Sequence, residues 1–178
     1  DIVILMIGSN DAMGSFDKKS GIRYMRDNNL PEIPTLEKYK EQISELISKL
    51  SNVPKIGVCS IPPIGENKDS LINNHAERFN DSIKAAANLN NIELLPVSDE
   101  IWSDISKRTY SLKKDYDSNA IPLMRRIFSG IYHHYLFKKS WNDIAKVKGQ
   151  WILFDQIHLN ERGAEIVFKL VKKFISKN

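Results

Sequence analysis

The feature that most constrains the fold is the short apolar run Ile2-Val3-Ile4-Leu5-Met6-Ile7, which ends at Gly8. A continuous run of this length, rich in β-branched residues, predicts a strand that is buried on both faces. Two runs of similar kind follow at residues 56–61 and 92–97. Because strands buried on both faces are typical of parallel sheets covered by helices, we expect a parallel sheet.

Amphipathic segments alternate with these runs. Thr35 can cap a helix whose apolar residues follow at helical spacing from Leu36 to Leu50. A second such segment covers residues 76–87, and Asn160 can cap a third that continues to Ile175. The alternation predicts one α/β domain over residues 1–178, with helices on both faces of the sheet and right-handed crossovers.

Two stretches depart from this alternation. Residues 8–34 are polar and contain Pro31 and Pro34, so we expect a loop there. Residues 99–150 form an insertion that is too long for an ordinary connection. In it, an apolar stripe at helical spacing predicts a helix that packs on the core with a solvated basic face. A lid or acyl-binding surface and a membrane-surface helix are the alternatives.

Composition argues against several classes of function. The net charge of +4 comes from 26 basic and 22 acidic residues that are spread along the chain, which does not favour nucleic-acid binding. No apolar run approaches the roughly 18 residues needed to cross a membrane. The sequence has no phosphate-binding glycine motif, and Asp115-x-Asp117-x-Asn119 lacks the glycine and the glutamate of a calcium loop. We therefore expect neither a cofactor nor a metal.

The motif Gly8-Ser9-Asn10-Asp11 follows the first predicted strand. Ligands of open α/β sheets bind beyond the carboxyl ends of the strands. The Asn10 amide has two N–H donors, which suit the stabilisation of an oxyanion. In the other interpretation, Asn10 and Asp11 are ordinary turn formers.

The motif Asp155-Gln156-Ile157-His158 precedes the last predicted helix. On a turn, this spacing lets Asp155 accept a hydrogen bond from one imidazole nitrogen of His158, which leaves the other nitrogen free to take a proton from a hydroxyl. Alternatively, Asp155 is a turn residue and His158 a partly buried polar residue.

The two motifs and the order in which they occur resemble the SGNH hydrolases, also called GDSL esterases and lipases. The resemblance covers most of the chain and is carried by Gly8-x-Asn10-Asp11, Ile61-Pro62-Pro63 and Asp155-x-x-His158-Leu159-Asn160-x-x-Gly163. It implies a three-layer α/β/α flavodoxin-like fold and ester hydrolysis through an acyl-serine intermediate. It also implies that His158 is the general base, Asp155 its orienting carboxylate and Asn10 an oxyanion donor.

The chain departs from the family because it has no Gly-Asp-Ser nucleophile block. Its strand at residues 2–7 matches the family's third strand, so two N-terminal βα units of about 60 residues would be missing. We expect a fragment in which a missing N-terminal segment, or another chain, covers the exposed strand at residues 2–7. Neither Ser9 nor Ser15 is expected to replace the nucleophile, and the isolated 178 residues are expected to show no turnover.

The resemblance leaves the substrate open, since an acyl lipid, an acetylated sugar and a short-chain ester suit the same machinery. The missing nucleophile favours an alternative function, namely a non-catalytic binding or assembly module derived from the SGNH fold. The sheet pattern alone is also typical of flavodoxin-like nucleotide or phosphate binders. The sequence indicates neither a compartment nor an oligomeric state.

Overall fold

Three parallel strands form the sheet, in the order β1-β2-β3, within the residues that the computed structural model describes, 1–50 and 52–177. The strands are β1 (Ile2–Leu5), β2 (Lys55–Cys59) and β3 (Glu93–Leu95). Val3 lies opposite Ile56, and Val58 lies opposite Leu94. The three predicted strands are confirmed, although each ends two residues before the apolar run does.

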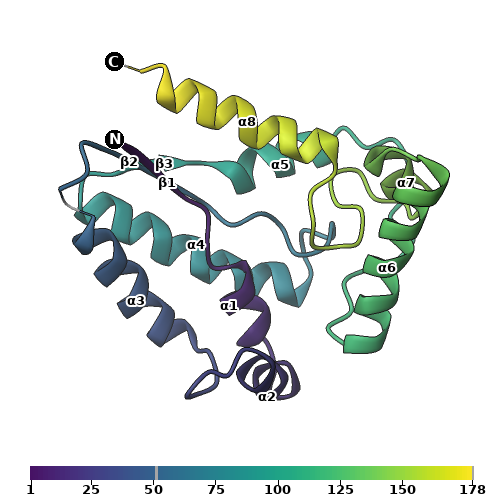
Figure 1. Ribbon diagram of the computed structural model, residues 1–178, viewed down its shortest axis with the longest axis horizontal. Coiled ribbons are helices and arrows are strands. Elements are labelled where there is room, and N and C mark those ends of the chain that lie inside the picture. The colour runs from purple at the N-terminus through teal and green to yellow at the C-terminus, as the bar shows by residue number, and fades with distance from the viewer. Residues whose placement is uncertain (51, 178) are drawn as a thin grey trace.

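Helices cover both faces of this sheet, as the alternation predicts (Figure 1). On one face lie α3 (Leu36–Lys49) and α4 (Leu71–Leu89), and on the other lie α5 (Val97–Ile105) and α8 (Glu161–Ile175). Successive strand residues point to opposite faces. Val58 therefore joins the core beneath α3 and α4, while Cys59 joins the core beneath α5 and α8. The fold is the three-layer α/β/α arrangement with a parallel sheet that the sequence predicts.

Both predicted helix caps are present. The Thr35 hydroxyl accepts a hydrogen bond from Lys38 N at 3.1 Å, and the Asn160 side chain accepts one from Gly163 N at 3.1 Å. A Cβ atom at Gly163 would lie 2.9 Å from side-chain atoms of Ile152 and Leu159. Glycine at this position therefore lets the first turn of α8 pack closely against the segment that precedes it.

Residues 8–34 are not a loop throughout, so that prediction was wrong. They contain α1 (Ser9–Gly14) and α2 (Lys18–Asp27). Tertiary packing stabilises such short helices more than propensity does. Here Ala12 and Met13 of α1 are buried in the core beneath α3 and α4, and Asp17 caps α2 by accepting from Ser20 N at 2.7 Å.

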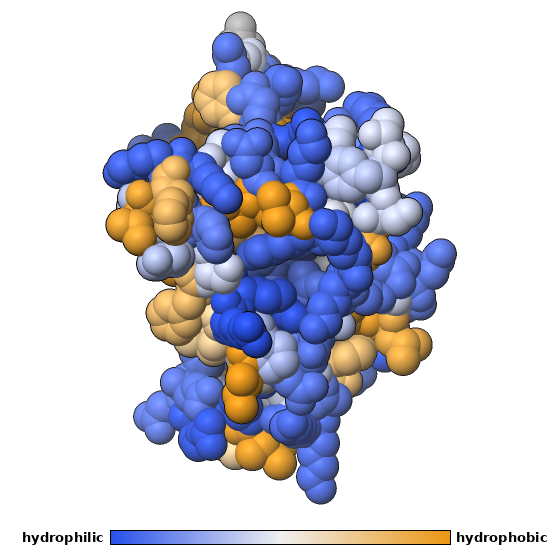
Figure 2. Space-filling model, turned by 90° about the vertical axis from the view of Figure 1, so that its right-hand side faces the viewer, coloured by the Kyte–Doolittle hydropathy of each residue, from blue (hydrophilic) through white to orange (hydrophobic). Residues whose placement is uncertain are grey.

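The insertion contains α6 (Ala120–Phe137) and α7 (Trp141–Val147), and α6 does not lie as expected. Six residues of the apolar stripe are 40% to 66% exposed, namely Met124, Phe128, Ile131, Tyr132, Tyr135 and Leu136. The helix instead turns Gly130 toward the body of the molecule, where an added Cβ would lie 2.9 Å from the Phe154 ring. Figure 2, which looks onto the side of α6 and α7, shows apolar groups among polar ones at the surface.

The strand β1 lies at one edge of the described sheet and pairs with β2 only. Ile2, Met6 and Ile7 are 44%, 45% and 40% exposed. An exposed apolar edge strand offers unpaired backbone groups to another segment. Among the described residues, none of the helices combines the length and the apolar character that crossing a membrane requires.

Candidate active site

Asp155 and His158 lie together in a tight loop after the core segment that precedes α8. An antiparallel bridge between Leu153 and Leu159 closes this loop. Asp155 Oδ1 accepts hydrogen bonds from the backbone N–H of Ile157 at 3.0 Å and of His158 at 2.8 Å. Asp155 Oδ2 lies 2.7 Å from His158 Nδ1. The loop backbone thus orients the carboxylate toward the imidazole, as the spacing of the motif predicts.

This geometry determines the state of the histidine. Asp155 is fully buried, whereas 56% of the His158 side chain is exposed. Because an ionised carboxylate only accepts hydrogen bonds, Nδ1 carries the proton and Nε2 of the neutral ring is an acceptor. Among the described residues, no hydrogen-bond partner occupies Nε2. His158 can therefore take a proton from a group that approaches from solvent.

The two groups shift each other's pKa. The hydrogen bond to Asp155 raises the pKa of His158 above its ordinary value of 6.5, against the opposing effect of burial. Burial alone would raise the pKa of Asp155, but the hydrogen bonds from His158 and Ile157 outweigh it and lower that pKa below 3.8. The carboxylate therefore stays ionised at neutral pH and would stabilise an imidazolium at His158.

We expect the native His158 ring to titrate above pH 6.5, and the Asp155→Asn variant to bring its pKa back toward that value. Because the folded pKa is raised, the stability that His158 contributes is present in full below pH 6.5 and is lost as the pH rises through the folded pKa. Imidazole chemical shifts followed by NMR check both statements. The Asp81→Asn variant, which changes an exposed carboxylate on α4, serves as the control, and an unshifted wild-type His158 would contradict the expected coupling.

The insertion contacts the loop from one side through aromatic rings. The His158 ring stacks on Phe154 with centroids 5.8 Å apart, and Phe154 meets Trp141 of α7 at 4.2 Å. Lys148 Nζ donates to the carbonyls of Phe154 at 3.0 Å and Arg126 at 3.3 Å. Sequence reasoning missed Trp141 and Lys148, because a single aromatic residue or lysine in a long insertion carries no local signal.

Asn10 lies on α1, immediately beyond the carboxyl end of β1. Gly8 allows the chain to turn from β1 into α1, because its φ of 111° favours glycine and an added Cβ would lie 2.5 Å from Tyr39 Oη. The Asn10 side chain is exposed and has no hydrogen-bond partner among the described residues. Ile157 packs against the core cluster that contains Ala12 of α1, so α1 and the loop share one core. The structure thus pairs Asp155 with His158 but shows no direct contact between either of them and Asn10 in the described part of the chain.

The structure also contains a serine–histidine contact that the sequence did not indicate. Ser15 Oγ lies 2.9 Å from His75 Nε2 and donates its one proton to Asp11 O at 2.7 Å. While the serine proton is in that bond, His75 Nε2 can only donate to Ser15 Oγ, so His75 is not placed as a base for this serine. Burial lowers the pKa of His75, which packs between the rings of Phe16 and Phe79. The arrangement is that of a structural contact rather than of an activated nucleophile.

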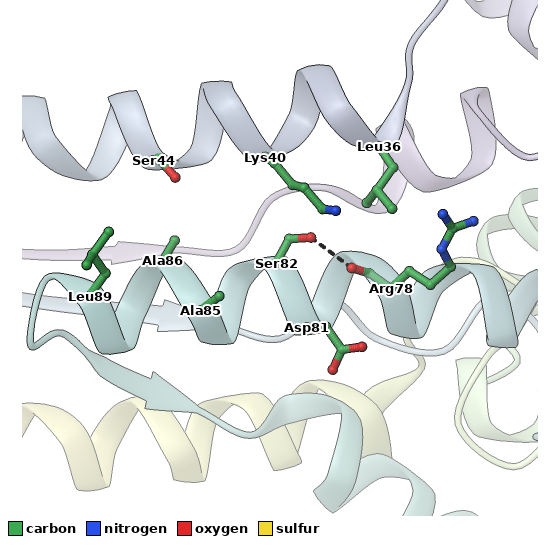
Figure 3. A pocket seen from close by; sticks show the side chains of 9 residues that line it. All are labelled: Leu36, Lys40, Ser44, Arg78, Asp81, Ser82, Ala85, Ala86 and Leu89. Atoms are coloured by element: carbon green, nitrogen blue, oxygen red, sulfur yellow. Dashed lines mark hydrogen bonds between the residues drawn. The ribbon is translucent and has the colours of Figure 1, made fainter.

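Figure 3 shows a groove that none of the residues of these motifs line. It has a volume of about 500 Å³ and runs between α3 and α4, lined by Leu36, Lys40, Ser44, Arg78, Asp81, Ser82, Ala85, Ala86 and Leu89. None of these residues belongs to the segments that carry Asn10, Asp155 or His158. Within residues 1–50 and 52–177, no group of three or more His, Cys, Asp or Glu side chains is placed to hold a metal ion.

Comparisons with known proteins agree with the fold. A family model described as GDSL-like lipase/acylhydrolase matches residues 1–171. An α/β hydrolase from the metagenome of Lake Arreo, Spain, is 17% identical over 97% of the chain, with a TM-score of 0.61. An acetylxylan esterase from Geobacillus stearothermophilus is 14% identical over 100% of the chain, also with a TM-score of 0.61. The chain spans 58% and 60% of the lengths of these two structures. No curated protein matches it.

Proposed function

The chain belongs to the GDSL-like lipase/acylhydrolase family, and we propose that it forms part of a serine esterase that hydrolyses carboxylic esters. The observation that carries this proposal is the Asp155–His158 pair. A buried carboxylate holds Nδ1 of an exposed imidazole at 2.7 Å, while Nε2 is open to an approaching hydroxyl. This geometry suits a general base with its orienting group, which supports the proposal.

In the proposed mechanism, His158 Nε2 takes the proton of a serine hydroxyl as the serine oxygen attacks the ester carbonyl carbon. The Asn10 amide donates to the resulting oxyanion. The tetrahedral intermediate collapses, the C–O bond to the alcohol breaks, and the His158 imidazolium protonates the leaving alcohol. Water then attacks the acyl-serine with His158 again as the base, which releases the carboxylic acid and regenerates the serine.

The serine itself is proposed to come from a segment that precedes Asp1. Two observations support this origin: the chain spans only 58–60% of its structural neighbours, and β1 has an exposed apolar edge. Catalytic mutants of the Geobacillus acetylxylan esterase replace a serine, an aspartate and a histidine. In that protein the last two are three positions apart, as Asp155 and His158 are in this chain. Another chain that contributes the serine and covers β1 is the alternative.

The substrate is proposed to be a small-molecule ester. An acetylated sugar is the first class to test, because the esterases among the structural neighbours are described as acting on acetylxylan and acetyl-xylooligosaccharide. The complete protein would be assayed with p-nitrophenyl acetate, a long-chain p-nitrophenyl ester and an acetylated xylooligosaccharide. A preference for the long-chain ester would indicate that the substrate is an acyl lipid instead.

Replacement of Asn10 by alanine in the complete protein is expected to lower kcat for p-nitrophenyl acetate by about 10²- to 10³-fold, because one oxyanion donor is lost. KM should change little, since the donor acts on charge that develops in the transition state. The Asn88→Ala variant removes an exposed amide from α4 and should leave kcat unchanged. A loss of kcat below tenfold in Asn10→Ala would remove Asn10 from the proposed site.

The second candidate function is a non-catalytic binding or assembly module, and the observation that favours it is the absence of a Gly-Asp-Ser block from the 178 residues. Reading the DNA upstream of Asp1 separates the two candidates. An in-frame Gly-Asp-Ser segment would support the esterase and exclude the binding module. A start codon immediately before Asp1 would support the binding module.

A further inference from the structure

We propose that Glu66 is a positioning residue that holds the loop of Asp155 and His158 in place through the backbone just before it. The inference rests on the proposed function and deepens it, because it concerns the geometry of the same site. Glu66 lies in the connection between β2 and α4, far from the loop in the sequence. Nothing in the sequence pattern singles it out.

The Glu66 carboxylate is fully buried and accepts from three consecutive backbone N–H groups. Oε1 accepts from Trp151 N at 2.9 Å, Ile152 N at 2.7 Å and Leu153 N at 2.8 Å. Oε2 accepts from Trp151 N at 2.8 Å and from Arg108 Nη1 at 2.7 Å. The exposed fraction of the side chain is 0% for Glu66 and 15% for Arg108. One ionised side chain thus satisfies a backbone segment that would otherwise have buried, unpaired donors.

Residues 151–153, which we call the platform, directly precede the loop and also bind the residue that follows it, Asn160. On their carbonyl side, Asn160 donates from its backbone N–H at 2.8 Å and from its side-chain amide at 2.9 Å. Gly65, next to Glu66, donates to Gln156 O at the tip of the loop at 2.8 Å. The platform is therefore fixed by Glu66 on one side and by the cap of α8 on the other.

The negative charge of Glu66 is essential to this arrangement. A glutamine of nearly the same size would present one oxygen and one NH₂ group where two oxygens now accept. Its NH₂ would face either the Arg108 guanidinium or the platform N–H groups, all of which are donors. Glu66→Gln should therefore loosen the platform without creating a cavity. Asp155, two residues beyond Leu153, would then hold His158 less accurately.

The test uses the complete protein and measures two quantities in Glu66→Gln. We expect kcat for p-nitrophenyl acetate to fall about tenfold to hundredfold, the loss typical of a misplacement near 1 Å, with KM within twofold. We also expect the NMR-measured pKa of His158 to move down toward 6.5, because the contact with Asp155 weakens. A purely structural role would lower the melting temperature but leave both quantities unchanged in the folded protein.

The control is Glu165→Gln, which removes an exposed carboxylate on α8 paired with Lys169 and should change neither quantity. If Glu66→Gln does not fold, Arg108→Lys takes its place, since it keeps the charge but loses the geometry of the guanidinium. It should lower kcat severalfold and shift the His158 pKa in the same direction. Unchanged kcat and unchanged pKa in a folded variant overturn the inference.

The two proposals fail separately in this design. If His158→Ala retains full esterase activity, the proposed function is wrong whatever Glu66→Gln does. If His158→Ala is inactive while Glu66→Gln keeps the wild-type kcat and His158 pKa, only the positioning role of Glu66 is wrong.

Discussion

Replacement of His158 by alanine in the complete protein is expected to lower kcat for p-nitrophenyl acetate by about 10⁴-fold or more. Alanine can neither take the serine proton nor protonate the leaving alcohol, so both steps of the proposed mechanism lose their catalyst. KM should stay within a few-fold, because the substrate is bound by other groups. The assay is steady-state hydrolysis with the background rate of the ester subtracted.

His133→Ala is the matched control for this variant. His133 also carries an imidazole, but it lies on α6 with Nδ1 bonded to Ser129 O at 2.7 Å and has no role in the proposed site. It should keep the wild-type kcat. If His158→Ala retained more than a tenth of the wild-type kcat, His158 could not be the general base.

Replacement of Asp155 by asparagine is expected to lower kcat by about 10⁴-fold while the protein stays folded. The asparagine Oδ1 can still accept from the backbone N–H groups of Ile157 and His158, so the turn is retained. Its NH₂ would now face His158 Nδ1 and favour the tautomer in which Nε2 carries the proton. In that tautomer Nε2 cannot accept a proton from the serine.

The raised pKa of His158 also determines how activity depends on pH in the wild type and in Asp155→Asn. Activity requires neutral His158, so kcat/KM of the wild type should rise with pH through the raised pKa of His158. In Asp155→Asn, the residual activity should also increase with pH, but the midpoint of this increase should lie at a lower pH. The reason is that the variant lacks the carboxylate that raises the pKa of His158. The Asp81→Asn variant should match the wild type in kcat and in pH profile. An Asp155→Asn variant with nearly wild-type kcat would show that the buried carboxylate does not orient the base.

Local patterns in the sequence were sufficient for a large part of the fold. The three strands are apolar runs, and Thr35 and Asn160 are caps that act within three residues of their partners. The Asp155–His158 contact could be predicted for the same reason, since both groups lie in one turn. Interactions over short sequence separations leave a readable pattern.

Other parts of the structure depend on contacts between distant segments. The helix α1 has six residues and is stabilised by burial of Ala12 and Met13 rather than by its own sequence pattern. For α6, the pattern shows where the apolar stripe is but not which side faces the body, and the contact of Gly130 with Phe154 decides that. The bonds from Glu66 to residues 151–153 join positions more than 80 residues apart, so no local signal could reveal them.

The most direct test of the central claim is covalent labelling of the complete protein with a serine-directed fluorophosphonate, followed by peptide mass spectrometry. The proposal predicts a single modified serine in a segment that precedes Asp1, and loss of this labelling in His158→Ala. A modified Ser9 or Ser15 would contradict the proposed origin of the nucleophile. Labelling that is undiminished in His158→Ala would contradict the role of the Asp155–His158 pair as its base.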